Sequence, residues 1–127
     1  MSENGSGARR VLIVEDDVMI RMLIEDMLAD LGFAVAAQAA KVHEALAAVN
    51  STDIDVAILD VNLSGETTGP VAEALAARGT PFVFATGYGE HTLPEQFRDR
   101  PLLKKPFRID ALKSMLDTAL ASAKLTS

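Results

Sequence analysis

The chain has 127 residues, 49% of them apolar, which is typical of one globular domain with a buried core and not of a disordered protein. It contains no cysteine, which excludes disulfide bonds and cysteine-based zinc sites. Its net charge of −6 argues against a nucleic-acid-binding surface, because such a surface needs clustered lysine and arginine.

The ends of the chain differ in composition from its middle. Residues 1–9 are mostly polar and rich in Gly and Ser, so we expect a flexible tail that lacks the apolar segment of a secretion signal. No apolar run approaches the roughly 18 residues that a membrane span needs. We therefore expect a cytoplasmic protein without a membrane partner, with one domain over residues 10–122 and a frayed C-terminus over residues 123–127.

Two hydrophobic patterns alternate along the chain. Short continuous apolar runs predict strands buried on both faces, and apolar residues at three- and four-residue spacing predict amphipathic helices. In chain order the expected elements are strand 11–14, helix 18–31, strand 33–38, helix 41–50, strand 56–60, helix 68–78, strand 81–85, strand 102–104 and helix 108–122. Asn62, Ser64 and Gly65 predict a loop after the third strand. Residues 90–100 are weakly patterned, so a helix there should be short or irregular.

Strands that alternate with helices predict an α/β fold with a parallel, doubly wound sheet. The flavodoxin-like (βα)5 arrangement, with strand order 2-1-3-4-5 and a shortened or irregular fourth helix, accommodates all the expected elements. This order makes the first and third strands neighbours. Their carboxyl ends then meet at the point where ligands bind in open sheets of this kind.

Acidic residues stand at both of these strand ends. Glu15, Asp16 and Asp17 follow the first strand, and Asp60 ends the third. Asp17 has a local explanation, because it can cap the helix that follows. The others could be a solvated acidic turn and a strand-terminating residue. Together, however, they would repel one another, and a hard divalent cation such as Mg²⁺ would relieve that repulsion.

Two further strand ends complete the pattern. Thr86 follows the fourth strand and Lys105 the fifth, so both side chains should reach the same edge of the sheet. Taken singly, they could be a turn residue and a surface charge. A carboxylate nucleophile with acids, a metal, a lysine and a hydroxyl suits phosphoryl transfer onto Asp60.

The chain resembles the receiver domain of two-component response regulators over about residues 10 to 122. The resemblance is carried by Val11-Leu12-Ile13-Val14-Glu15-Asp16-Asp17, Ile58-Leu59-Asp60-Val61-Asn62-Leu63, Ala85-Thr86 and Lys105-Pro106-Phe107. It implies that Asp60 accepts a phosphoryl group from a histidine kinase or a histidine phosphotransfer protein.

The resemblance also implies a set of site residues. Mg²⁺ is placed on Asp16, Asp60 and the backbone carbonyl of Asn62, with Glu15 acting directly or through water, and Asp17 outside the metal shell. Thr86 and Lys105 would bind the phosphoryl oxygens. Lys105–Pro106 is a candidate cis peptide bond.

One position departs from the family pattern. Receivers usually carry an aromatic switch residue three places before the lysine, where this chain has Leu102. Residues 81–88 instead resemble the subgroup named for its Phe-Ala-Thr-Gly-Tyr (FAT GUARD) motif, often stand-alone receivers that work with histidine kinases of the HWE or HisKA2 class. We expect Gly87, Tyr88 and the loop over residues 87–100 to replace the missing switch.

We expect no effector domain after residue 122. Output would then be a contact with a downstream protein, through the loop after Thr86, the fifth strand and the last helix, or removal of phosphate from other proteins. The expected protein is a phosphoacceptor and not an enzyme. A non-phosphorylated scaffold with this fold is an alternative. A haloacid-dehalogenase-type phosphatase fits poorly, since it needs an aspartate where Asn62 stands, and a flavodoxin-type carrier fits poorly because the acids would repel a flavin phosphate.

Overall fold

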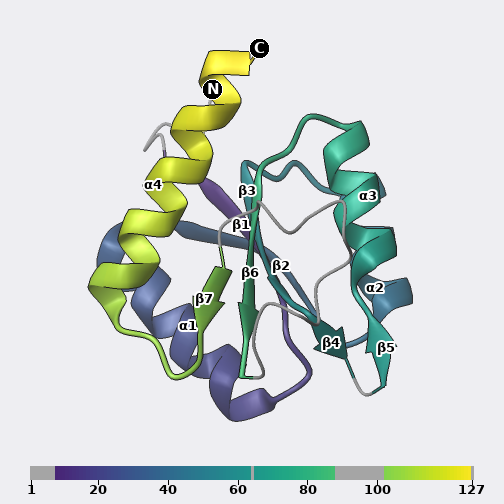
Figure 1. Cartoon of the computed structure of the whole chain (residues 1–127), viewed down its shortest axis with the longest axis horizontal. Coiled ribbons are helices and arrows are strands. Elements are labelled where there is room, and N and C mark those ends of the chain that lie inside the picture. The colour runs from purple at the N-terminus through teal and green to yellow at the C-terminus, as the bar shows by residue number, and fades with distance from the viewer. Residues whose placement is uncertain (1–7, 64, 88–101, 127) are drawn as a thin grey trace.

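A computed structural model of the chain describes residues 8–63, 65–87 and 102–126 (Figure 1). Its centre is a parallel sheet in the spatial order β2-β1-β3-β6-β7. These strands are β1 (Arg10–Val14), β2 (Ala34–Ala39), β3 (Val56–Asp60), β6 (Phe82–Thr86) and β7 (Leu102–Lys104). Counted along the chain, this is the order 2-1-3-4-5, so the flavodoxin-like prediction is confirmed.

Helices cover both faces of the sheet. They are α1 (Val18–Leu31), α2 (Val42–Ser51), α3 (Gly69–Ala77) and α4 (Ile109–Thr126). Figure 1 shows α1 and α4 on one side of the sheet and α2 and α3 on the other. Among the residues described, no helix combines the length and the apolar composition that crossing a membrane requires.

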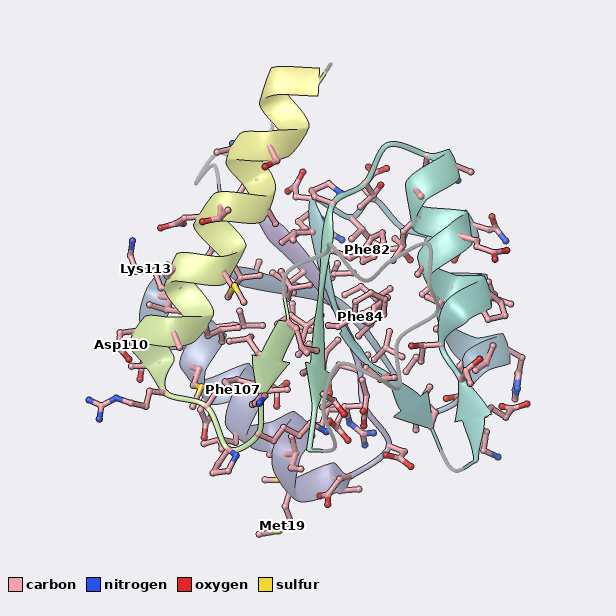
Figure 2. All side chains as sticks on the ribbon, viewed as in Figure 1. Met19, Phe82, Phe84, Phe107, Asp110 and Lys113 are labelled. Atoms are coloured by element: carbon pink, nitrogen blue, oxygen red, sulfur yellow. The ribbon has the colours of Figure 1, made fainter. Side chains whose placement is uncertain are left out.

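The apolar runs form strands because both faces of the sheet are covered. All five residues of β3 are buried. Ala57 and Leu59 pack in the cluster beneath α2 and α3, whereas Val56 and Ile58 pack in the cluster beneath α1 and α4. Successive side chains of a strand point to opposite faces, so a sheet between two helix layers needs apolar residues at every position. The Phe82 and Phe84 rings, with centroids 5.5 Å apart, add an edge-to-face contact to this core (Figure 2).

Helix α1 begins and ends where the sequence predicts. The Asp17 side chain accepts hydrogen bonds from the Met19 and Ile20 N–H groups at 2.9 and 3.2 Å, which satisfies two donors that have no partner within the helix. Gly32 ends the helix with φ +86°, a left-handed conformation that glycine adopts without steric cost. The cap also fixes the turn directly after Glu15 and Asp16.

Replacing Asp17 by alanine should destabilise the fold. We expect Asp17→Ala to lower the free energy of unfolding by about 1 kcal/mol, measured by urea denaturation at neutral pH. Asp17→Asn is the matched control, because asparagine accepts the same hydrogen bonds and should cost much less. Equal losses in the two variants would show that the carboxylate charge, and not the cap, stabilises this turn.

The predicted loop after β3 contains a small hairpin instead. Strands β4 (Asn62–Leu63) and β5 (Glu66–Thr67) pair antiparallel, and Gly65 turns between them with φ +91°. The turn residues predict that the chain reverses here, as it does, but such short strands carry no hydrophobic pattern that would distinguish them from a loop. Their pairing depends on backbone hydrogen bonds, which the sequence does not specify.

The last helix is longer than predicted. Helix α4 runs to Thr126, so the expected helix end at residue 122 is wrong. Residues 121–126 contain neither Gly nor Pro and include good helix formers, so nothing in the sequence stops the helix at Ser122. The predicted short or irregular helix over residues 90–100 lies outside the described residues, as does Tyr88.

Candidate functional site

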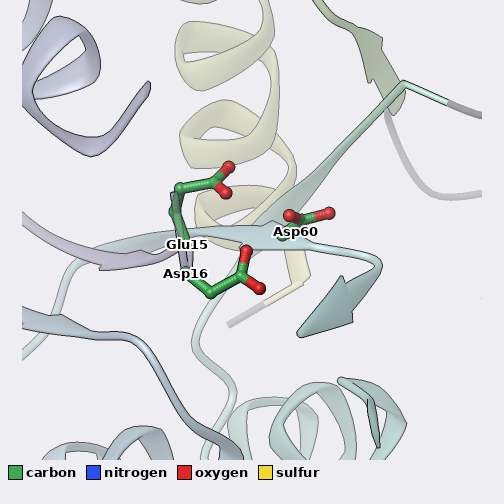
Figure 3. A group of neighbouring side chains, drawn as sticks. All are labelled: Glu15, Asp16 and Asp60. Carbon is green, nitrogen blue, oxygen red and sulfur yellow. The ribbon is translucent and has the colours of Figure 1, made fainter. Parts of the chain in front are cut away.

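The acids of the first and third strands meet at one end of the sheet. Strands β1 and β3 are parallel neighbours with Val14 opposite Leu59, so Glu15 and Asp60 are the next residues in register. One carboxylate oxygen from each of Glu15, Asp16 and Asp60 lies within 4.8 Å of the others. Figure 3 shows the three carboxylates grouped where these two strands end. The juxtaposition predicted from the strand order is confirmed.

Lys105 connects two of these acids. Its Nζ donates to Glu15 Oε1 at 2.5 Å and to Asp60 Oδ2 at 3.0 Å. The side chains of Lys105, Glu15 and Asp60 are 15%, 3% and 12% exposed, so the contacts are only weakly screened by water. Lys105 is therefore the counter-charge of the acidic group and not a solvated surface lysine.

Burial changes the protonation equilibria of this group. Burial raises the pKa of Glu15 above its ordinary value, although hydrogen bonds from Lys105 and from the Asp17 N–H act in the opposite direction. For Lys105, burial alone would lower the pKa, but hydrogen bonds to Glu15 and Asp60 raise it above its ordinary value. The lysine therefore stays protonated at neutral pH and can hold an anionic group.

The sheet brings Thr86 and Lys105 to the same edge as the acids. Strands β6 and β7 are parallel, with Thr86 opposite Lys104, and the Lys105 N–H donates to the Thr86 carbonyl at 2.9 Å. Thr86 is buried. The predicted cis peptide bond between Lys105 and Pro106 is present. Both residues thus come from the strand ends that the sequence predicts.

Arg21 supports the acidic turn, a role that sequence reasoning missed. Its Nη1 donates to the Glu15 carbonyl at 3.0 Å, from one turn inside α1. The Asp17 N–H donates to Glu15 Oε2 at 3.1 Å. These two bonds fix the backbone and the side chain of Glu15. The bond from Arg21 ends on a backbone atom, so no residue pattern reveals it.

The hairpin after β3 orients the Asn62 carbonyl. The Thr68 N–H donates to the Val61 carbonyl at 3.1 Å, and Asn62 is paired with Thr67. In an antiparallel ladder hydrogen-bonded and non-hydrogen-bonded pairs alternate, so Asn62 and Thr67 form a non-hydrogen-bonded pair. The Asn62 carbonyl is therefore directed away from β5, out of the hairpin, where it could coordinate a ligand.

These oxygen atoms are of the kind that a hard divalent cation prefers. Carboxylates and a backbone carbonyl are typical ligands of Mg²⁺, and the mutual repulsion of three clustered carboxylates favours its binding. Asp17 uses a carboxylate oxygen to cap α1, and its position outside the metal shell stays a prediction. The residues present fit a magnesium site.

The subgroup residues are only partly described. Gly87 is exposed directly after β6, and Tyr88 lies outside the described residues. Leu102, which replaces the usual aromatic residue, is half-buried against the cluster beneath α2 and α3. The proposed replacement of the switch by Tyr88 and its loop therefore stays a prediction.

Together the fold and the site define a flavodoxin-like domain with a cluster of acidic side chains, two of them bridged by a lysine, at the carboxyl ends of its strands. A family model of the response regulator receiver domain matches residues 11–117, and the chain belongs to this family. Receiver domains typically bind Mg²⁺ at an acidic site and interact with histidine kinases or phosphotransfer proteins. Membership decides against the phosphatase and flavodoxin alternatives.

Individual relatives agree with this assignment. The solution structure of SdrG from Sphingomonas melonis is 48% identical, with a TM-score of 0.77 over 91% of this chain and 96% of that one. The receiver domain of the response regulator PhyR from Erythrobacter litoralis is 30% identical, with a TM-score of 0.81 over 91% and 92%. The transcriptional regulatory protein PdtaR of Mycobacterium tuberculosis is 32% identical over 89% of this chain, which spans only 57% of that relative.

Proposed function

We propose that this chain is a phosphoacceptor whose Asp60 receives a phosphoryl group from a phosphohistidine on a histidine kinase or histidine phosphotransfer protein. One observation carries the proposal: Asp60 ends the central strand within reach of Lys105 and two other carboxylates. Its side chain is 12% exposed, so a donor can reach it while the surrounding groups remain largely shielded.

The transfer exchanges one bond to phosphorus for another. An Oδ atom of Asp60 bonds to phosphorus while the bond from phosphorus to the donor imidazole nitrogen breaks, and that nitrogen keeps the electron pair. The product is an acyl phosphate, and attack by water later returns the carboxylate and inorganic phosphate. The phosphoryl group is accepted by the protein's own carboxylate and changes the state of the protein itself, so we describe the chain as a signalling phosphoacceptor and not as an enzyme.

The other site residues have distinct tasks. Bound Mg²⁺ would supply positive charge that neutralises the phosphoryl oxygens. Asp16, Asp60 and the Asn62 carbonyl would hold it, with Glu15 contributing directly or through water. The Lys105 ammonium already contacts Asp60 Oδ2 and would hold a phosphoryl oxygen there, and the Thr86 hydroxyl would bind another.

The direct test uses a small phosphodonor. We expect the protein incubated with acetyl phosphate and Mg²⁺ to gain one phosphoryl group, detected by intact mass spectrometry. If neither acetyl phosphate nor a panel of phosphorylated histidine kinases labels it, the non-phosphorylated scaffold is the better description.

An exposed apolar face beside the site suggests where a protein donor docks. Val18, Met19, Met22 and Leu23 are 55%, 78%, 56% and 49% exposed, and helical spacing places them on one face of α1. This face begins three residues after Glu15, and Figure 2 shows Met19 projecting from the molecule. Exposed apolar clusters mark binding surfaces, and a donor that reaches Asp60 would cover this one.

Removing this apolar face should slow phosphotransfer from a protein donor but not from a small-molecule donor. We expect the double variant Met19→Gln, Met22→Gln to slow phosphotransfer from a phosphorylated histidine kinase by about tenfold or more. Labelling by acetyl phosphate should not change, because the small donor needs no docking surface. Glutamine preserves length and helix propensity.

Ala29→Gln is the control for this double variant, because Ala29 is exposed at the other end of the same helix. It should transfer at the wild-type rate from both donors. A double variant that accepts phosphate from its kinase at the wild-type rate would contradict the assignment of α1 as the docking face.

A second surface is a candidate for output. A groove of about 500 Å³ lies between β7 and the start of α4. Its lining is partly apolar and includes Leu102, Pro106, Phe107, Ala111 and Met115. Phosphorylation adds about −1.5 to −2 charge beside Lys105, next to this groove, and so could change what binds there. We propose that a downstream protein partner binds at this surface. If no partner binds and the phosphoryl group is only lost to water, the chain acts as a phosphate sink.

The kinase class is also a proposal. Phe84-Ala85-Thr86-Gly87 at the end of β6 supports the Phe-Ala-Thr-Gly-Tyr subgroup and hence a kinase of the HWE or HisKA2 class. Phosphotransfer from kinases of that class, compared with kinases of other classes, tests the assignment.

A further inference from the structure

Thr68 uses its hydroxyl in an unexpected way. It is the N-cap residue of α3, a position where threonine normally accepts hydrogen bonds from the first N–H groups of the helix. Here the side chain makes no such bond. Its Oγ1 instead donates to the Asp60 carbonyl at 2.6 Å, with the Val61 carbonyl at 3.3 Å. The residue is 1% exposed.

The backbone of Thr68 strengthens the same connection. Its N–H donates to the Val61 carbonyl at 3.1 Å, and its carbonyl accepts from the Ala72 N–H within α3. Thr68 thus joins three elements: the end of β3, the base of the hairpin and the first turn of α3. These hydrogen bonds hold together the two ends of the closed loop between Asp60 and Thr68.

Asn62 is the residue that this closed loop presents. It lies two positions after Asp60. Its carbonyl points away from β5, because the adjacent bond of the ladder runs from the Thr68 N–H to the Val61 carbonyl and Asn62 is therefore in a non-hydrogen-bonded pair. If the Thr68 hydroxyl were absent, the Asp60 carbonyl would lose its short hydrogen bond, while the Val61 carbonyl would keep only the bond from the Thr68 N–H. The direction of the Asn62 carbonyl relative to the Asp60 carboxylate would then be less firmly fixed.

We infer that Thr68 is a positioning residue of the phosphorylation site, whose hydroxyl holds the Asp60–Asn62 backbone in the geometry that binds Mg²⁺. This inference rests on the proposed function, since it assigns Asp60 and the Asn62 carbonyl as ligands. Groups that orient metal ligands through hydrogen bonds typically change metal affinity by about 10- to 100-fold when removed.

The experiment compares Mg²⁺ binding without any phosphodonor. Thr68→Val keeps the shape and removes the hydroxyl, Thr68→Ser keeps the hydroxyl and removes the methyl, and Thr67→Val changes the exposed neighbour on β5. Isothermal titration calorimetry gives the Mg²⁺ dissociation constant of each, and thermal unfolding gives its stability. We expect Thr68→Val to bind Mg²⁺ about tenfold more weakly, with Thr68→Ser and Thr67→Val within about twofold of wild type.

A purely structural role gives a different result. In that case Thr68→Val would unfold at lower temperature yet bind Mg²⁺ with the wild-type dissociation constant, which would overturn the inference. If Thr68→Val does not fold, the Mg²⁺ affinity of Thr68→Ser decides. Wild-type affinity in Thr68→Ser supports the role of the hydroxyl, whereas a tenfold loss would show that the methyl group positions the site and would overturn the inference. Labelling of the wild type by acetyl phosphate is scored separately, so failure of the proposed function is distinguishable from failure of the role of Thr68.

Discussion

Asp60→Asn should abolish phosphorylation by acetyl phosphate, whereas the wild type gains one phosphoryl group. The amide lacks the anionic oxygen that attacks phosphorus, and no other group described at the site is placed to substitute for it: Glu15 is buried beneath Lys105, and Asp16 is a proposed metal ligand. Intact mass spectrometry after incubation with acetyl phosphate and Mg²⁺ measures the result. We expect loss of all detectable labelling, the largest effect of any single substitution in the chain.

Asp53→Asn is the matched control for this substitution. Asp53 precedes β3 at the opposite end of the strand, and its side chain is exposed. This variant should be labelled like the wild type. Labelling that persists in Asp60→Asn would move the acceptor to another residue, and Glu15 or Asp16 would then be tested in the same way.

The sequence predicted the sheet and the position of Asp60 for one physical reason. A strand covered on both faces must be apolar throughout, and in a parallel sheet the residues that follow such runs gather at one edge. The apolar runs that end at Val14 and Leu59 therefore place the acids that follow them, Glu15 and Asp60, at the same edge of the sheet. Lys105 followed from the same argument, although its contacts with Glu15 and Asp60 needed the structure.

The contacts that the sequence does not predict are hydrogen bonds to backbone atoms. The Arg21 guanidinium and the Thr68 hydroxyl both donate to carbonyl groups, and every residue has a carbonyl, so no residue type marks the acceptor. The hairpin escaped prediction for the same reason. The predicted end of the last helix at residue 122 rests only on the general tendency of chain termini to fray, whereas residues 121–126 contain no Gly or Pro and continue the helix.

Lys105→Met should destabilise the protein in the absence of Mg²⁺. Methionine fills similar space but leaves the buried Glu15 and Asp60 carboxylates without their counter-charge. Removing one partner from a buried ion pair typically costs about 3 kcal/mol or more. We expect a loss of about that size in the free energy of unfolding at pH 7, measured by urea denaturation, and partial recovery when Mg²⁺ is added. Lys104→Met is the control, because Lys104 is exposed.

The pH dependence of this loss follows from the two pKa shifts. Burial raises the pKa of Glu15 above 4.5, so the folded state binds its proton more tightly, and ionisation of Glu15 opposes folding as pH rises through the folded pKa. The positive charge of Lys105 offsets that cost. Because the pKa of Lys105 is raised above 10.5 in the folded state, the stabilisation that it provides is complete below pH 10.5 and is lost as pH rises through the folded-state pKa. The difference between wild type and Lys105→Met should therefore be smaller at pH 4 than at pH 7, and should decrease again at strongly alkaline pH. A difference that stays constant over this range would mean that Lys105 stabilises the fold through its aliphatic chain and not through its charge.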